Sequence, residues 1–495
     1  MVLQVILAGL LFALVVLTIW PRKPPSIPPG LWGWPLIGAL PSTDVAIADQ
    51  VKELRKKYGD IISWRLGSRL FIYLCNFKLI KTVFSRADVI DRPDFYSVRS
   101  ITQLQEGGIV NANGQLWLNN RRFTLRHLKD LGMGKSHLGE AIEKEAQFLV
   151  EDFKKYLNKP TSLPWSINVA VLNVLWQMMA GIRYNISDEK ITKFSKIVYE
   201  GSLGFEGTVF LLDIFPRLES WLPFAVKSWL GMNRIYESTA KINDFIRSEI
   251  VEARVKTFDP GNPKDYIDAY FLEMEGQKND PNSTMNLEDL CHTLTDLFGA
   301  GSITTAMTIK WAVLYLAKYP EVQKKAQKEI DLVVSRNVVP SLDQKDKLPY
   351  IEALCYEILR LTTLATMGMP HSNEKDIELD GYRIPKNSVL IGHLECCNKD
   401  PAYWERPNDF YPEHFLDENG KLSSKREGFL PFSVGKRLCV GESLARMELY
   451  VFLAALIQNF TFTAPEGEKL SIEKNPTERI LAVPQPFNII ITQRE

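Results

Sequence analysis

The spacing of apolar residues predicts one long helix and a pair of strands before any motif is considered. From residue 287 to Tyr319, apolar side chains recur at helical spacing, behind a cap formed by Asn286 and before Pro320, which ends the run. Such a helix is about 50 Å long, because each residue adds about 1.5 Å. Between residues 61 and 74 apolar and polar positions alternate, which is typical of strands. We therefore expect a long helix in the second half of the chain and a short sheet near its start.

The first residues predict a membrane anchor. Residues 1–20 carry no charged side chain and are long enough to span a bilayer. Arg22 and Lys23 follow at once, so the positive-inside bias places the remainder of the chain in the cytosol. A cleaved signal peptide is the alternative, but the segment has neither a charged start nor a small-residue cleavage site before Trp20-Pro21. The expected organisation is an anchor at 1–20, a proline-rich hinge at 21–36 and a single catalytic domain at 37–495.

The long helix is not expected to be a second membrane span, because Asp289, Asp296 and Lys310 interrupt it.

Composition excludes several classes of protein. The 495 residues carry 59 basic and 59 acidic side chains, so no overall charge points to nucleic acid. None of the six cysteines forms a CxxC pair, which argues against zinc ribbons and disulfide frameworks and favours a reducing compartment. No Gly/Ser/Pro linker interrupts the chain after the N-terminus. These observations predict one large intracellular catalytic domain.

The most informative stretch is the loop at residues 431–446, which a helical apolar pattern follows. It reads Pro-Phe-Ser-Val-Gly-Lys-Arg-Leu-Cys-Val-Gly-Glu-Ser-Leu-Ala-Arg. Gly435 permits a tight turn, and Cys439 lies just before a helix start, whose free N–H groups lower the pKa of a thiol. The loop therefore suits delivery of one thiolate to a metal. An inert buried cysteine is the alternative, and for most lone cysteines it is the better interpretation.

This loop resembles the haem-thiolate loop of the cytochrome P-450 monooxygenases. The matching positions are Phe432, Gly435, Arg437, Cys439 and Gly441. At average residue usage, five such matches arise by chance in on the order of one chain in several thousand. The resemblance implies a mainly α fold with a small β-sheet (α+β), the haem-thiolate fold. It also implies haem b (iron protoporphyrin IX), with Cys439 as the axial iron ligand and the other four positions beside the haem.

The resemblance also assigns residues to the haem propionates. Trp117 and Arg121 are four apart and share a helix face, which suits one propionate. Arg92 and His371 occupy further positions that are similar to the family's haem-binding residues. For Trp117 and Arg121 the alternative is a surface arginine stacked on an aromatic ring. For His371 it is a surface histidine.

The centre of the long helix resembles the family's oxygen-binding notch, with Ala300, Gly301 and Thr304 as its residues. Two small residues let a flat group approach, and a mid-helix threonine can bond to the carbonyl four residues earlier. The family usually has Asp or Glu just before this threonine, where this chain has Ile303. Thr304 and ordered water would then relay protons alone. The departure leaves open an isomerase or dehydratase that needs no external electrons.

Three further residues resemble a structural cluster of the family. Glu357 and Arg360 lie three apart on one predicted helix and match the buried Glu-x-x-Arg pair. The usual third partner is an arginine, and His414 stands at its position. We interpret His414 as a variant of the same cluster.

Several apolar segments are expected to face or cover a lipophilic substrate. They are Leu364, Met367 and Met369, residues 481–484, and the apolar region at 194–232, which in the family roofs the cavity and dips into the membrane. A plain pair of core helices is the alternative for the last.

The resemblance implies NADPH-dependent hydroxylation or epoxidation at the endoplasmic reticulum membrane. Electrons would come from NADPH through NADPH-cytochrome P-450 reductase, with a contribution from cytochrome b5 left open. The sequence pattern of residues 115–153 looks like the second large animal clan, and most like arthropod members that act on hormone-type isoprenoids or steroids. Epoxidation of a farnesoate is the first hypothesis. A broad xenobiotic, steroid or fatty-acid monooxygenase is the second, and a non-enzymatic haem sensor is a third class.

Overall fold

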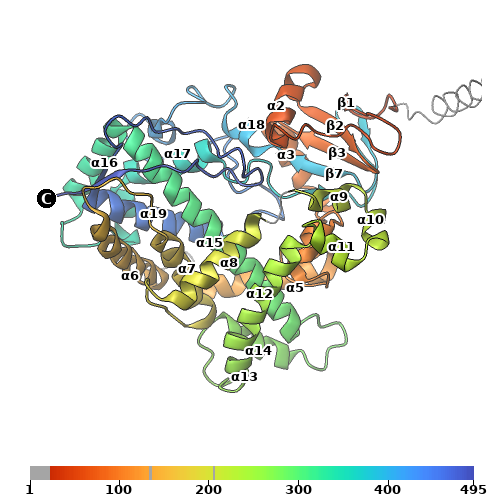
Figure 1. The fold of residues 1–495 in the computed structure, drawn as a ribbon. Helices are drawn as coiled ribbons and strands as arrows, with labels where there is room; N and C mark the ends of the chain where they lie inside the picture. Colours follow the sequence, from red (N-terminus) through yellow and green to blue (C-terminus); the bar gives the residue numbers. More distant parts are fainter. Residues whose placement is uncertain (1–22, 133–135, 204–206) are drawn as a thin grey trace, which may run out of the picture.

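The computed structural model describes residues 23–132, 136–203 and 207–495. The predicted anchor at 1–20 and the start of the hinge lie outside the described residues. Figure 1 shows a mainly helical body with a small sheet at one end, as the resemblance implied.

The helices are α2 (Ile47–Tyr58), α3 (Phe77–Phe84), α4 (Tyr96–Arg99), α5 (Gly114–Asp130), α6 (Ser136–Phe153), α7 (Ser166–Ala180), α8 (Glu189–Leu203), α9 (Val209–Ile214), α10 (Arg217–Trp221), α11 (Phe224–Trp229), α12 (Arg234–Ile246), α13 (Glu252–Val255), α14 (Tyr266–Gly276), α15 (Leu287–Lys318), α16 (Pro320–Val333), α17 (Pro349–Thr362), α18 (Leu394–Asn398) and α19 (Glu442–Asn459). The strands are β1 (Gly30–Leu31), β2 (Ile61–Leu66), β3 (Arg69–Leu74), β4 (His371–Ser372), β5 (Ile377–Leu379), β6 (Tyr382–Ile384), β7 (Val389–Gly392), β8 (Phe460–Thr463) and β9 (Ile490–Gln493).

The main sheet joins strands from both ends of the chain. Its order is β1-β2-β3-β7-β4, and β5-β6 and β8-β9 form two smaller sheets. The predicted strands are confirmed as β2 and β3, which pair antiparallel with Ile61 opposite Leu74. The β7 strand then adds in parallel to β3, with Val389 beside Phe71. The sheet therefore ties residues near the start of the domain to a segment far along the chain.

Helix α15 confirms the predicted long helix at both ends. The Asn286 side chain accepts a hydrogen bond from the Asp289 amide, and the helix ends one residue before Tyr319. It packs against α7, α12, α17 and α19 in the middle of the helical body (Figure 1). Among the described residues it is long and apolar enough to cross a membrane, yet 67% of its most apolar stretch is buried in the domain. We therefore interpret α15 as a core helix.

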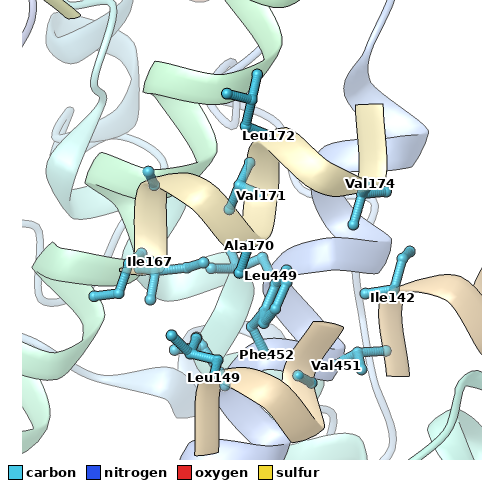
Figure 2. Packing of buried hydrophobic residues seen from close by; sticks show 14 of the residues in the cluster. Ile142, Leu149, Ile167, Ala170, Val171, Leu172, Val174, Leu449, Val451 and Phe452 are labelled. Atoms are coloured by element: carbon cyan, nitrogen blue, oxygen red, sulfur yellow. The ribbon is translucent and has the colours of Figure 1, made fainter. Parts of the chain in front are cut away.

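Helices α6, α7 and α19 meet within the largest cluster of buried apolar residues. Side chains from all three helices interdigitate there, among them Ile142, Leu149, Ala170, Leu449 and Phe452 (Figure 2). Helix α7 is buried on almost every side, which explains why its sequence is apolar without a polar stripe. This packing fixes α19, which begins at Glu442, three residues after Cys439, so the last residues of the 431–446 stretch are its first turn.

A buried ionic cluster joins α17 to the segment that precedes the cysteine loop. Glu357 and Arg360 are both fully buried and form a two-pronged pair, with N···O distances of 2.7 and 2.8 Å. Arg360 also donates to three backbone carbonyls, those of Asn398, Pro407 and Asp409. His414 lies 3.3 Å from the Glu357 carboxylate through Nδ1. The five hydrogen bonds of Arg360 satisfy every donor of its guanidinium, as a buried charge requires.

Replacing Arg360 by Met should lower the free energy of unfolding by about 3–5 kcal/mol, because Glu357 would remain buried and unpaired. Denaturant unfolding and the yield of folded protein would measure the loss. The matched control is Arg383→Met, which breaks an exposed pair with Asp376 and should change stability little. Equal stability of the two variants would contradict a structural role for the cluster.

Candidate active site

The cysteine loop is a tight turn held by its own backbone. The Cys439 amide donates to the Phe432 carbonyl at 3.2 Å, and the Leu438 amide donates to the Gly435 carbonyl at 3.1 Å. Gly435 has a φ of +86°, and a Cβ at this position would lie 2.1 Å from the Phe84 carbonyl oxygen. Glycine is therefore required here by conformation and by space.

The Cys439 thiol lies at the N-terminus of α19 and borders accessible space. The backbone amides of Gly441 and Glu442 lower its pKa, as the sequence predicted, and the Arg121 charge acts in the same direction. Burial opposes them and is the larger effect, so the pKa of Cys439 lies above its ordinary value. The helix start acts in the predicted direction, and Cys439 as a thiolate ligand stays a prediction. A bound metal cation would lower the pKa of this thiol further.

The notch residues lie on the middle of α15. The Thr304 hydroxyl donates to the Ala300 carbonyl at 2.7 Å, which is the predicted bond to the residue four positions earlier. Ala300 is exposed and Thr304 is half-buried, although most of the surrounding helix is buried. Gly301 has a different reason to be small, because a Cβ there would meet the Leu175 side chain of α7 at 3.0 Å. The close approach of α7 therefore explains the glycine at position 301. Ala300 is the small residue on the exposed face of α15.

Five donor side chains from distant segments gather beside the cysteine loop: Arg92, Trp117, Arg121, His371 and Arg437. The Arg437 guanidinium lies 4.0 Å from the Trp117 ring centroid, and Arg121 donates to the Leu438 carbonyl at 2.6 Å. Arg92 donates to the carbonyls of Pro370 and Val110. The His371 Nδ1 lies 2.8 Å from the Val89 carbonyl, which leaves Nε2 as the free ring nitrogen.

This cationic group lacks a matching anion within the described residues. None of its three arginines forms an ion pair with a carboxylate there. Burial and the neighbouring Arg92 lower the pKa of Arg437 to about 8, while Asp91 acts in the opposite direction. Burial and Arg121 lower the pKa of Arg92 to about 10. Burial and Arg92 lower the pKa of His371 to about 3. Charges that repel one another in a buried place fit an anionic ligand.

An unpartnered donor supports the same conclusion. The Trp117 Nε1 atom is buried and has no hydrogen-bond partner. Buried indole N–H groups usually find one. One N–H donor and three guanidinium groups around a cysteine loop match the two propionates of haem b, so the residues present fit that group.

Two polar side chains that organise this region were not predicted from the sequence. Asn113 accepts from the Arg92 amide at 2.8 Å and from Arg437 at 3.1 Å, so it joins the two arginines. Asp296 of α15 accepts from the amides of Ile109 and Val110, at 2.7 and 2.9 Å. Burial raises the pKa of Asp296 to about 6. Contacts of both residues join segments that lie far apart in the sequence, so no short-range sequence pattern predicts them.

The apolar segments expected near a substrate meet at one place. The Ala482 amide donates to the Leu364 carbonyl at 2.8 Å, and the Trp311 indole of α15 donates to the Ala482 carbonyl at 2.6 Å. Ile303 is buried within the main core cluster. In the region 194–232, Trp221, Phe224, Val226 and Trp229 are exposed, and Trp229 is 84% accessible. A plain pair of core helices does not account for these exposed side chains.

Comparison with known proteins agrees with this geometry. The profile of the Cytochrome P450 family matches residues 28–491. The chain is 50% identical to Cytochrome P450 2L1 of Panulirus argus over 478 residues, covering 96% of each chain. It is 34% identical to Cytochrome P450 2J2 of Homo sapiens over 478 residues, which is 94% of this chain and 92% of the relative. It is 35% identical to Cytochrome P450 2G1 of Oryctolagus cuniculus over 458 residues, which is 90% of each chain.

Replacing Gly435 by Ala should abolish haem binding, because neither the left-handed backbone nor the Phe84 carbonyl can accommodate a Cβ. Absorbance of the ferrous carbon monoxide complex would report the loss. The matched control is Gly420→Ala, which has a φ of +71° with nothing within 4 Å of the added Cβ. The control should cost about 1 kcal/mol and keep the spectrum. An intact spectrum in Gly435→Ala would show that the loop is not built as described.

Proposed function

The chain belongs to the cytochrome P450 family and is a haem-thiolate monooxygenase by class, and from this premise we propose that it oxidises a lipophilic isoprenoid at the endoplasmic reticulum membrane. The observation that carries the proposal is the group of three arginines, two of them buried, and one unpartnered indole N–H beside the Cys439 loop. Haem b held there would supply the redox chemistry that activates dioxygen. Cys439 would hold the iron, while Arg92, Trp117, Arg121, His371 and Arg437 would hold the propionates.

The protein's own residues would shape the reaction on the α15 side. The Thr304 hydroxyl, bonded to the Ala300 carbonyl, offers an oxygen on the accessible side of the helix that can pass a proton from water. Ile303 carries no ionisable group and is packed in the core, so it cannot take part. We propose that Thr304 and ordered water carry the proton relay without a carboxylate at that position.

The substrate class follows from the apolar segments that meet at Leu364 and Ala482. Ligand sites lined by apolar side chains bind their ligands largely through hydrophobic burial and a few polar contacts. Epoxidation of a farnesoate is the first candidate, because the sequence pattern resembles arthropod hormone-metabolising members. A broad specificity for xenobiotics, steroids or fatty acids is the second candidate, supported by the similarity to several mammalian relatives such as Cytochrome P450 2J2 and 2G1.

The proposed partners and location follow from the same membership. NADPH would act through NADPH-cytochrome P450 reductase, and cytochrome b5 would be tested as a second donor. Exposed Trp221, Phe224 and Trp229 could lie against a membrane surface, together with the predicted anchor at 1–20.

Product formation with a panel of sesquiterpenoids, steroids and fatty acids would test the proposal. The protein would be reconstituted in membranes, with and without NADPH and reductase. We expect product only with NADPH, with one oxygen atom from labelled dioxygen and the highest kcat/KM for a farnesoate. Product without NADPH would instead assign isomerase or dehydratase chemistry. A preference for steroids or fatty acids would replace the first candidate by the second.

Replacing Cys439 by Ala should abolish the thiolate spectrum and all NADPH-dependent product, because the loop then offers no iron ligand. The control is Cys355→Ala, which truncates a buried thiol on α17 and should keep both. A thiolate spectrum that survives in Cys439→Ala would move the iron ligand elsewhere.

A further inference from the structure

A single buried carboxylate on α18 collects three lysines. Glu395 is 2% exposed, and its Oε1 atom lies 2.8 Å from the Nζ atoms of both Lys399 and Lys474. Its Oε2 atom lies 2.6 Å from the Nζ atom of Lys52 on α2. Burial alone would raise the pKa of Glu395, but the three lysines hold it well below its ordinary value. The carboxylate is therefore charged at neutral pH, and it joins three segments that lie far apart in the sequence.

This cluster carries more positive than negative charge. Lys52 has a second partner, because its Nζ atom lies 2.8 Å from the Asp49 carboxylate. Lys399 and Lys474 have Glu395 as their one ion-pair partner within the part of the chain that the structure describes. Burial lowers the pKa of Lys474, and so do the charges of Lys52 and Lys399. Lys474 therefore depends on Glu395 to stay in place, because the other two lysines repel it.

Lys474 lies at the base of a chain reversal, residues 474–484, which we call the C-terminal hairpin. It pairs antiparallel with Pro484, and the Asn475 amide donates to the Val483 carbonyl at 2.8 Å. The returning half of the hairpin contains the apolar residues that are expected to face the substrate. The position of Lys474 therefore affects the position of these apolar residues.

Glu395 also holds the second segment that is expected to face the substrate. The Glu395 amide donates to the Thr366 carbonyl at 3.2 Å, and the Lys474 ammonium donates to the Thr366 hydroxyl at 3.3 Å. Thr366 lies two residues after Leu364, whose carbonyl accepts from the Ala482 amide of the C-terminal hairpin. One carboxylate thus fixes two apolar segments relative to each other.

The far end of the C-terminal hairpin has a separate contact. The Tyr199 hydroxyl of α8 donates to the Glu478 carboxylate at 3.0 Å. Loss of the contact at Lys474 would therefore shift the base of the hairpin without detaching the whole segment. A change at Glu395 should alter the shape of the site and leave the domain folded.

We propose that Glu395 is a positioning residue that determines substrate specificity, because it holds the C-terminal hairpin and residues 364–369 at a fixed separation. Without its charge, the other two lysines repel Lys474, and the base of the hairpin moves away from Thr366. Apolar ligands then lose contact with this side of the site. The effect on substrates rests on the proposed function, whereas the contact itself is a property of the folded protein.

The ligand-binding test compares Glu395→Gln, Lys474→Met and Lys52→Met with the parent protein. The probes are imidazole and the bulkier 4-phenylimidazole, whose ring nitrogen can bind haem iron and shift its absorbance. We expect the affinity for 4-phenylimidazole, relative to imidazole, to fall by about fivefold or more in Glu395→Gln and Lys474→Met, because the phenyl ring loses apolar contacts. Lys52→Met is the matched control. It removes an ion pair with the same carboxylate but no contact to the hairpin, and it should keep the parent ratio.

The double variant of Glu395→Gln and Lys474→Met should behave like either single variant, because both substitutions break the same contact. In turnover with the best substrate of the panel, the KM should rise by about fivefold while kcat changes little, since the lost contacts bind substrate and transition state alike. Additive effects in the double variant, an unchanged KM in Glu395→Gln, or an equal loss of affinity in Lys52→Met would overturn the proposal. All variants should keep the ferrous carbon monoxide spectrum.

Hydrogen exchange tests the contact without substrate or turnover. The amides of Asn475 and Ala482 should exchange about tenfold faster in Glu395→Gln and Lys474→Met, and at the parent rate in Lys52→Met. Equal exchange in Glu395→Gln and the parent would refute the positioning role. If neither imidazole probe changes the absorbance of the parent protein, the proposed function fails, while hydrogen exchange still decides whether Glu395 holds the C-terminal hairpin.

Discussion

The structure depends on the burial of positive charge beside the cysteine loop. Arg92 and Arg437 come from opposite ends of the domain and are satisfied mainly by backbone carbonyls. Burial and Arg92 lower the pKa of Arg437, and burial, Arg92 and Arg437 lower the pKa of His371, so this group of side chains suits an anionic ligand. Ligand binding would therefore supply part of the stability of this region, because any group bound by the folded state alone shifts the folding equilibrium.

The sequence predicted the elements with strong local patterns and the residues inside short motifs. The α15 helix was defined by Asn286, its apolar period and Pro320, and the β2–β3 pair by alternation. Local spacing indicates the helix start beside Cys439, but not the surrounding protein groups that raise the pKa of its thiol. Asp296 was noted only as an interruption of the apolar run, since its partners lie in another segment of the chain.

Ala300 and Gly301 in the middle of α15 also show what local sequence patterns cannot predict. From the sequence, both are small residues that would let a flat group approach. In the structure, the two positions lie on different faces of the helix. Gly301 points to α7, whereas Ala300 points to the accessible side. The direction depends on which helix packs against which face, and this is a property of tertiary packing.

The pairing of β3 with β7 places a limit on when the domain can be completed. Phe71 lies beside Val389, so the central pairing of the sheet joins residues separated by roughly 300 positions. During synthesis at about 5–20 residues per second, the β2–β3 hairpin would wait roughly 15 to 60 seconds with an unpaired edge. A nascent chain in that interval would offer its β3 edge to chaperones or to other nascent chains. The five donor side chains beside the cysteine loop include Arg92 and Arg437, which lie far apart in the sequence. They would therefore come together only late in folding.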